Sequence, residues 1–104
     1  MLTQSQIQNI VDTIVKGYKP EKVILFGSYA NGNASKEIDL DFVIIKKTDT
    51  RFIERAREIH GLFHPYPWAM DIFVFTPKEF KKRKKIYGTL EYIVDKEGKT
   101  VYAN

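Results

Sequence analysis

The sequence contains no cysteine among its 104 residues. This absence excludes a disulfide framework and a thiolate zinc site, and it agrees with a reducing compartment. The sequence also lacks a signal peptide and any apolar run of about 18 residues, the length that a membrane-spanning helix requires. Internal repeats and low-complexity segments are absent as well. We therefore expect a soluble cytoplasmic protein.

The length predicts one domain, residues 1–104, with a single hydrophobic core and no room for a second domain. Lysine and arginine number 17 against 13 acidic residues, which gives a formal net charge of +4. This balance favours anionic partners such as nucleotides or nucleic acid, but it does not choose between them.

Apolar spacing predicts an α/β fold. Helical periodicity occurs over residues 2–16 and 51–63, and a short basic helix begins at Thr76 and Pro77. Strands are expected over residues 23–26, 39–45, 69–75, 90–94 and 100–102, with a hairpin turn at residues 96–99. The helix at 51–63 is expected to cross over from the strand at 39–45 to the strand at 69–75, as parallel neighbouring strands require. We expect a mixed β-sheet with helices packed mainly on one side.

We expect different roles for the basic residues of the two later helices. In the helix at 51–63, Arg51, Arg55 and Arg57 are expected on the solvated face. The later helix places Phe80 and Tyr87 at a spacing that predicts contact with the core. Its basic side chains are Lys78, Lys81, Lys82, Arg83, Lys84 and Lys85. They form either a basic rim that binds triphosphate, nucleic acid or an acidic partner, or a solvated face whose lysine stems cover apolar surface.

Three acidic residues stand in or beside apolar strands. Asp39 and Asp41 are two residues apart, so in an extended strand their side chains lie on the same face. Carboxylates crowded in this way repel each other unless a cation or a shared proton lies between them, and Mg²⁺ prefers such oxygen ligands. Alone, the pair is better explained as a polar strand edge that faces water. Asp71 opens another apolar strand, where an acid is costly without a partner.

Gly27 and Ser28 follow directly after the apolar residues 23–26. Glycine allows the backbone to approach a ligand closely, and amide groups at the opening of a helix, helped by a serine hydroxyl, bind phosphate oxygens. The turn and the acids together predict a site for a nucleoside triphosphate and its metal ions.

The run Gly27-Ser28-Tyr29-Ala30-x-Gly32-x-Ala34, followed by Asp39-x-Asp41 and an apolar strand, resembles the signature of the minimal nucleotidyltransferases. These are small members of the DNA polymerase β-like nucleotidyltransferase superfamily. The resemblance implies that Gly27 and Ser28 hold the triphosphate and that Asp39 and Asp41 bind nucleotide and two Mg²⁺ ions. It also implies that Asp71 is the third acid of a metal-binding, catalytic set.

The same resemblance implies a function. It predicts transfer of a nucleoside monophosphate, AMP, from ATP to a hydroxyl. The acceptor suggested by the family is a tyrosine of a helical HEPN-type partner, with this chain as the antitoxin of a toxin-antitoxin pair. The alternative is a non-catalytic module that neutralises its partner by contact. Nucleic-acid binding through the basic helix is a third and less favoured class.

Two positions depart from the family pattern. Ile38 stands where the family usually has serine before the first metal acid, and Asn31 stands where a basic residue is common. Neither departure removes an expected metal ligand. Each bears on activity and on the choice of nucleotide.

Overall fold

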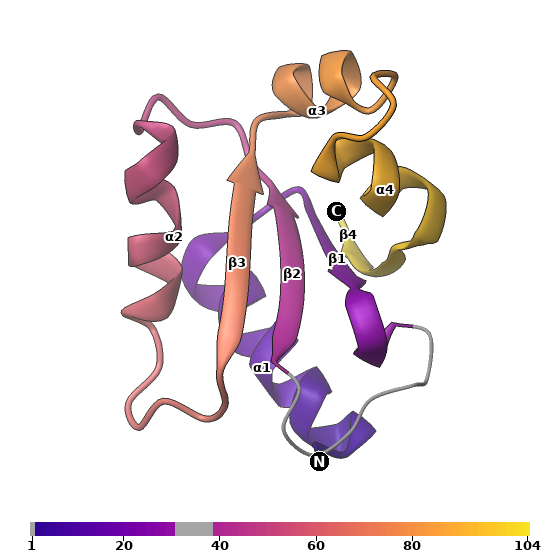
Figure 1. Ribbon diagram of the computed structural model, residues 1–104. Helices are drawn as coiled ribbons and strands as arrows, with labels where there is room; N and C mark the ends of the chain where they lie inside the picture. The colour runs from indigo at the N-terminus through magenta and orange to yellow at the C-terminus, as the bar shows by residue number, and fades with distance from the viewer. Residues whose placement is uncertain (1, 31–38) are drawn as a thin grey trace.

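The computed structural model describes residues 2–30 and 39–104, without the side chain of Ser28. Four strands form one sheet in the order β3-β2-β1-β4. The elements are α1 (Gln4–Tyr18), β1 (Lys22–Phe26), the 3₁₀ turn η1 (Gly27–Tyr29), β2 (Leu40–Ile45), α2 (Phe52–His60), β3 (Met70–Phe75), α3 (Pro77–Arg83), α4 (Leu90–Glu97) and β4 (Lys99–Ala103) (Figure 1). Only the β2–β3 pairing is parallel among the three described pairings, so the predicted mixed sheet is confirmed.

Helix starts follow the capping chemistry in the sequence. Thr3 caps α1: its hydroxyl accepts from the Gln6 amide at 3.1 Å, and the Gln6 side chain accepts from the Thr3 amide at 2.8 Å. Thr76 and Glu79 form the same reciprocal pair at the start of α3, with Pro77 as the first helical residue. Such capping boxes satisfy amide groups that have no partner inside the helix. No described helix is both long enough and apolar enough to cross a membrane.

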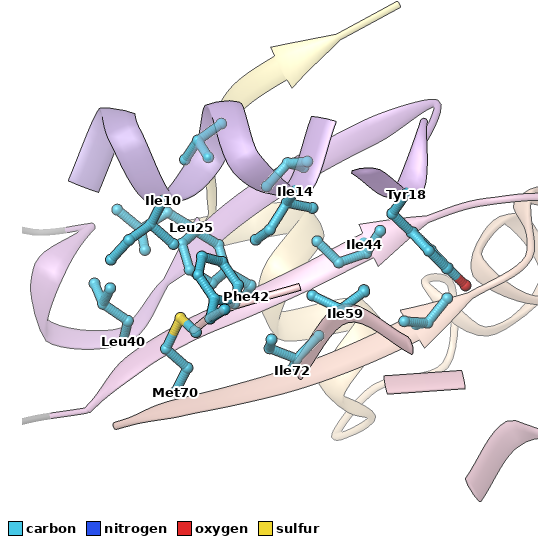
Figure 2. Close-up of a cluster of buried hydrophobic side chains, with 14 residues drawn as sticks. Ile10, Ile14, Tyr18, Leu25, Leu40, Phe42, Ile44, Ile59, Met70 and Ile72 are labelled. Carbon is cyan, nitrogen blue, oxygen red and sulfur yellow. The ribbon is translucent and has the colours of Figure 1, made fainter. Parts of the chain in front are cut away.

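The main core lies between one face of the sheet and the two longer helices, α1 and α2. Its fully buried side chains include Ile14, Leu40, Phe42, Ile44 and Ile59. Figure 2 shows these side chains interdigitating between the helices and the strands. Because alternate residues of a strand point to opposite faces, the intervening residues Asp41, Val43 and Ile45 belong to the other face.

The second face has a smaller core, which α3 and α4 cover at one end. Val94 of α4 is buried against this face with Ile24, Val43, Ile45 and Phe75. Our prediction of a strand at residues 90–94 is therefore wrong, and these residues lie in helix α4. The hydroxyl of Thr89 accepts from the Tyr92 amide at 3.0 Å and caps this helix. The cap and the burial of Val94 outweigh the β-branched residues that suggested a strand.

The predicted hairpin at residues 96–99 is also wrong, because this segment joins α4 to β4. Gly98 follows the helix, and a Cβ at this position would lie 2.6 Å from both a side-chain carbon of Ile24 and the carbonyl of Val94. The last strand therefore pairs with β1 instead of residues 90–94. Within that pairing the register shifts between Val23 and Ile24.

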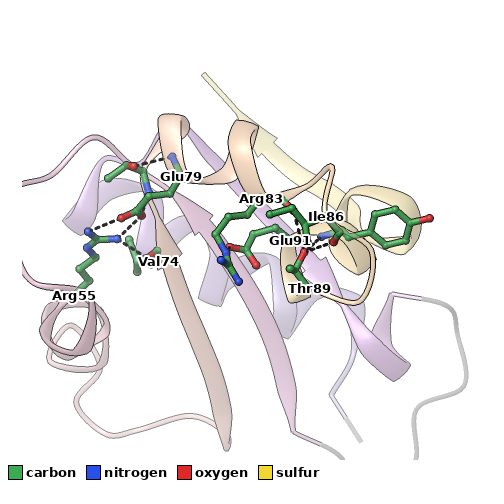
Figure 3. A network of polar contacts seen from close by, with 9 residues as sticks. Arg55, Val74, Glu79, Arg83, Ile86, Thr89 and Glu91 are labelled. Carbon is green, nitrogen blue, oxygen red and sulfur yellow. Dashed lines mark hydrogen bonds and ion pairs between the residues drawn. The ribbon is translucent and has the colours of Figure 1, made fainter.

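Arg55 is buried, with 7% of its surface exposed, so its expected place on a solvated face is wrong. Its guanidinium donates to Glu79 at 2.7 and 3.2 Å, and also to the carbonyls of Val74 and Thr50 (Figure 3). These contacts tie α2 to β3 and α3. The hydrogen bond from Arg55 is the main reason that the pKa of Glu79 lies below its ordinary value.

The segment after α3 also differs from expectation. Tyr87 is 86% exposed, so its predicted contact with the core is wrong, whereas Phe80 packs against the second core as expected. The difference arises because α3 ends at Arg83. The helical spacing that was projected from Phe80 to Tyr87 does not continue that far.

Candidate active site

Two of the predicted acids lie directly opposite each other. Asp41 is the second residue of β2 and Asp71 the second residue of β3, and the parallel register pairs them. Both belong to the second face of the sheet, at the end where β2 and β3 begin. Backbone pairing therefore fixes the relative position of these two carboxylates, although 30 positions separate them along the chain.

The electrostatics of this pair are strained. The pKa of the Asp41 carboxyl is raised to about 6, first by burial, then by the charge of Asp71 and a hydrogen bond with its side chain, and last by the charge of Asp39. Each of these causes disfavours the ionised form of Asp41. Burial and neighbouring negative charge thus both oppose the ionisation of Asp41.

Gly27 places the backbone against the same carboxylate. Its φ of +77° lies in the left-handed region, and a Cβ built there would be 2.5 Å from an Asp41 carboxylate oxygen. The preceding residue, Phe26, is the register partner of Asp41 across the β1–β2 pairing. Glycine is needed at this position for both its dihedral angle and its lack of a side chain. The glycine turn and the acids are thus one local structure.

Asp39 lies just before β2 and is exposed. It acts on Asp41 through its charge. Within residues 2–30 and 39–104, no three acidic, histidine or cysteine side chains gather closely enough to form a ready-made metal cage. Among the described residues, the acids of this site are thus the pair Asp41 and Asp71, with Asp39 beside them. The departures Ile38 and Asn31 lie outside the described residues.

Tyr66 is a neighbour of the acids through the charge of Asp71. The pKa of its hydroxyl is raised by burial and by the charge of Asp71. Its ring stacks on His60 at 5.6 Å, and its hydroxyl contacts the Nδ1 atom of that histidine. The available signal was an aromatic residue in the loop that leads into β3, which does not reveal its neighbours.

The basic helix lies at the other end of the sheet. α3 follows the last residue of β3, whereas Asp71 is near the first. β2 and β3 run from their starts near the lower edge of Figure 1 toward α3 above them. A strand advances about 3.3 Å per residue, so about 13 Å separates Asp71 from the end of β3. This geometry opposes our suggestion that the basic rim binds a triphosphate held at the acids.

Comparisons with known proteins agree with this combination of an α/β sheet, paired strand acids and a glycine turn. Residues 5–102 match the profile described as the nucleotidyltransferase domain. The chain belongs to this family, and its class of activity is nucleotidyl transfer. The search of curated proteins found no match.

Solved structures with the same fold include a protein from Sulfolobus solfataricus that is provisionally assigned as a nucleotidyltransferase. It has a TM-score of 0.64 and 16% identity, covering 96% of this chain and 79% of that one. A toxin-antitoxin structure with AMP-PNP has a TM-score of 0.64 and 17% identity, covering 99% and 75%. A mutant of the toxin-antitoxin MntA-HpeT, with two aspartates changed to glutamate, has a TM-score of 0.62 and 15% identity, covering 93% and 73%. These likenesses confirm the predicted fold.

Proposed function

We propose that this protein transfers AMP from ATP to a hydroxyl acceptor and releases pyrophosphate, with Mg²⁺ as its cofactor. The observation that carries the proposal is the local structure in which Asp41 faces Asp71 and the Gly27 backbone lies against the Asp41 carboxylate. This structure occurs in a chain of the nucleotidyltransferase domain family.

The described donor atoms fit magnesium. Asp39, Asp41 and Asp71 offer hard carboxylate oxygens, and Mg²⁺ commonly combines one or two carboxylates with water and substrate phosphates. Burial, and then the charge and hydrogen bond of Asp71, raise the pKa of Asp41, and a bound cation would offset these effects. When bound, Mg²⁺ would neutralise phosphate charge and favour ionisation of the attacking hydroxyl.

The chain's own residues would then orient the phosphates and deprotonate the attacking hydroxyl. The Gly27 turn would bring backbone amides to the phosphates, together with Ser28. Asp71 would accept the proton of the attacking hydroxyl. That oxygen forms a bond to the α-phosphorus as the bond to the β-phosphate oxygen breaks, and pyrophosphate leaves with the electron pair. The protein contributes position and charge, the two main terms in phosphoryl chemistry.

For the acceptor, we propose a tyrosine of a HEPN-type protein, with this chain acting as an antitoxin in the cytoplasm. Two of the structural neighbours are toxin-antitoxin structures, and one contains a nucleotide analogue. The second candidate is a module that neutralises its partner by contact, and the exposed side chains Ile53, Ile86 and Tyr87 favour some protein contact.

Calorimetric titration of ATP into the purified chain, with and without Mg²⁺, tests the proposal. We expect binding that depends on Mg²⁺ and that is lost in Asp39→Asn. The matched control is Asp49→Asn, which makes the same chemical change at an exposed loop position beyond the far end of β2. Equal binding by wild type and Asp39→Asn would contradict a nucleotide site at these acids.

Transfer itself is measured with ATP labelled at the α-phosphate and a purified HEPN-type partner. We expect label on the partner with wild type and with Asp49→Asn, and none with Asp41→Asn. If Asp41→Asn still neutralises the partner fully, the contact module is the better description of the function.

A further inference from the structure

A groove of about 390 Å³ lies at the end of the sheet away from the acids. Its floor includes Ile45 and Phe80, and its rim carries Lys22, Lys81, Lys84 and Lys85. These lysines come from the start of β1 and from α3 with the turn that follows it. The groove is thus assembled from segments that are distant in sequence and meet where β2 and β3 end.

The positive charge of this groove is largely uncompensated. Across residues 2–30 and 39–104, no acidic group forms an ion pair with Lys22, Lys81 or Lys85. Lys84 has one acidic neighbour, Asp95, at 3.9 Å. Like charges gathered around a concave surface raise the local concentration of anions. The arrangement therefore favours an anionic ligand.

An aromatic pair lies close to the groove residues along the chain, because Tyr87 follows Lys85 by two positions. Tyr87 is 86% exposed and meets Tyr92 edge to face, with ring centres 5.3 Å apart. Tyr92 lies three residues before Asp95 on α4, which places both on one side of that helix, and Asp95 lines the groove. Lys96 lies over the Tyr92 ring at 5.5 Å. The exposed Tyr87 ring, two residues after a groove lysine, offers a surface on which a flat ligand can stack.

We infer that this groove binds single-stranded nucleic acid, with phosphates along the lysines and a base stacked on Tyr87. A basic groove that follows the backbone and an adjacent aromatic platform are the two parts that sequence-tolerant binding of single strands requires. Lysines offer mobile point charges instead of paired donors, which suits a phosphate backbone without a fixed sequence. The surface is separate from the acids, so this inference does not depend on the proposed function.

Fluorescence anisotropy with a labelled 12-nucleotide uridine strand tests the inference. EDTA keeps divalent ions away from the acids. For four lysines, the logarithm of the binding constant should fall with the logarithm of NaCl concentration with a slope near −3. We expect Lys81→Gln/Lys85→Gln to weaken binding at least tenfold at low salt and to reduce this slope by about half. Tyr87→Ala should weaken binding about tenfold at an unchanged slope, and Tyr87→Phe should restore it.

The control is Arg57→Gln/Lys99→Gln, which removes the same charge from exposed positions outside the groove. We expect its affinity to stay within twofold of wild type. Equal losses in the two double variants would show that net charge alone attracts the strand and would overturn the inference. Absence of binding, or preference for a 12-residue polyglutamate over the strand, would also overturn it, the latter in favour of an acidic protein partner. A thymidine strand of equal length determines whether RNA or DNA is preferred.

Discussion

The two ends of the sheet carry opposite charge on different kinds of support. At one end, Asp41 and Asp71 are short side chains held in register by strand pairing, and Gly27 lies against one of them. At the other end, the groove lysines are long side chains at the start of β1, on α3, a helix in which no residue is fully buried, and on the turn after it. Rigid support fixes atomic positions, which chemistry needs. Long side chains spread charge over a surface, which is enough to attract a polyanion.

The largest effect should come from breaking the rigid end. Asp71→Asn keeps the size of the side chain and removes the proposed proton acceptor and one metal ligand. We expect transfer to fall at least a thousandfold, a loss of about 4 kcal/mol in transition-state stabilisation. Single-turnover measurements with labelled ATP give this value. A decrease of less than tenfold in the transfer rate would remove Asp71 from the proposed catalytic set.

Gly27→Ala should produce the next largest effect. The new methyl group would meet the Asp41 carboxylate in a left-handed backbone, so we expect about 3 kcal/mol of lost folding stability as well as lost transfer. Gly88→Ala is the matched control, because Gly88 has a similar φ of +88° but no atom within 4 Å of its Cβ position. It should cost about 1 kcal/mol.

A double variant separates the two causes. If the clash with Asp41 contributes, Gly27→Ala will cost less in an Asp41→Ala background than in wild type. Identical costs in both backgrounds, measured by urea unfolding, would show that the backbone angle alone accounts for the loss.

A smaller effect concerns pH in the absence of metal. The pKa of Asp41 is raised on folding, so the folded state binds its proton more tightly and loses stability as pH rises from about 4 to 6. Asp41→Asn removes this penalty. Above pH 6 we expect the variant to be more stable than wild type by about 1 kcal/mol, after solvent screening is allowed for.

Urea unfolding in EDTA at pH 4 and pH 7.5 measures this difference. Added Mg²⁺ should reverse the order at pH 7.5, because only wild type retains the full set of carboxylates. If the difference in unfolding free energy between wild type and Asp41→Asn is the same at pH 4 and pH 7.5, the strained carboxyl pair is contradicted.

The smallest effect should follow from changing the lysine end of the sheet. Lys81→Gln/Lys85→Gln alters exposed side chains that make no described ion pair. We expect folding stability within about 0.5 kcal/mol of wild type and unchanged transfer to the partner. Thermal unfolding and the transfer assay check this together. A large loss of transfer would show that the two ends act on one ligand.

Several features encoded by local sequence were predicted correctly. β2 and β3, the Thr76 cap and the place of Asp71 on the face opposite Ile72 depend on alternation and on short-range capping. Two features that depend on distant partners were predicted wrongly. The burial of Arg55 depends on Glu79, 24 residues further along the chain. The helical state of residues 90–97 depends on the burial of Val94 against the second face of the sheet.

The pairing of Asp41 with Asp71 also limits how this chain can change length in evolution. One residue inserted near the start of β2 or β3 would move the following side chains to the opposite face, because side-chain direction alternates along a strand. The acids would then point into the main core or lose their register. Insertions in the connections at residues 46–51 and 61–69 leave that alternation intact. Related chains with working acids should therefore vary in length in these connections and keep both strands free of insertions.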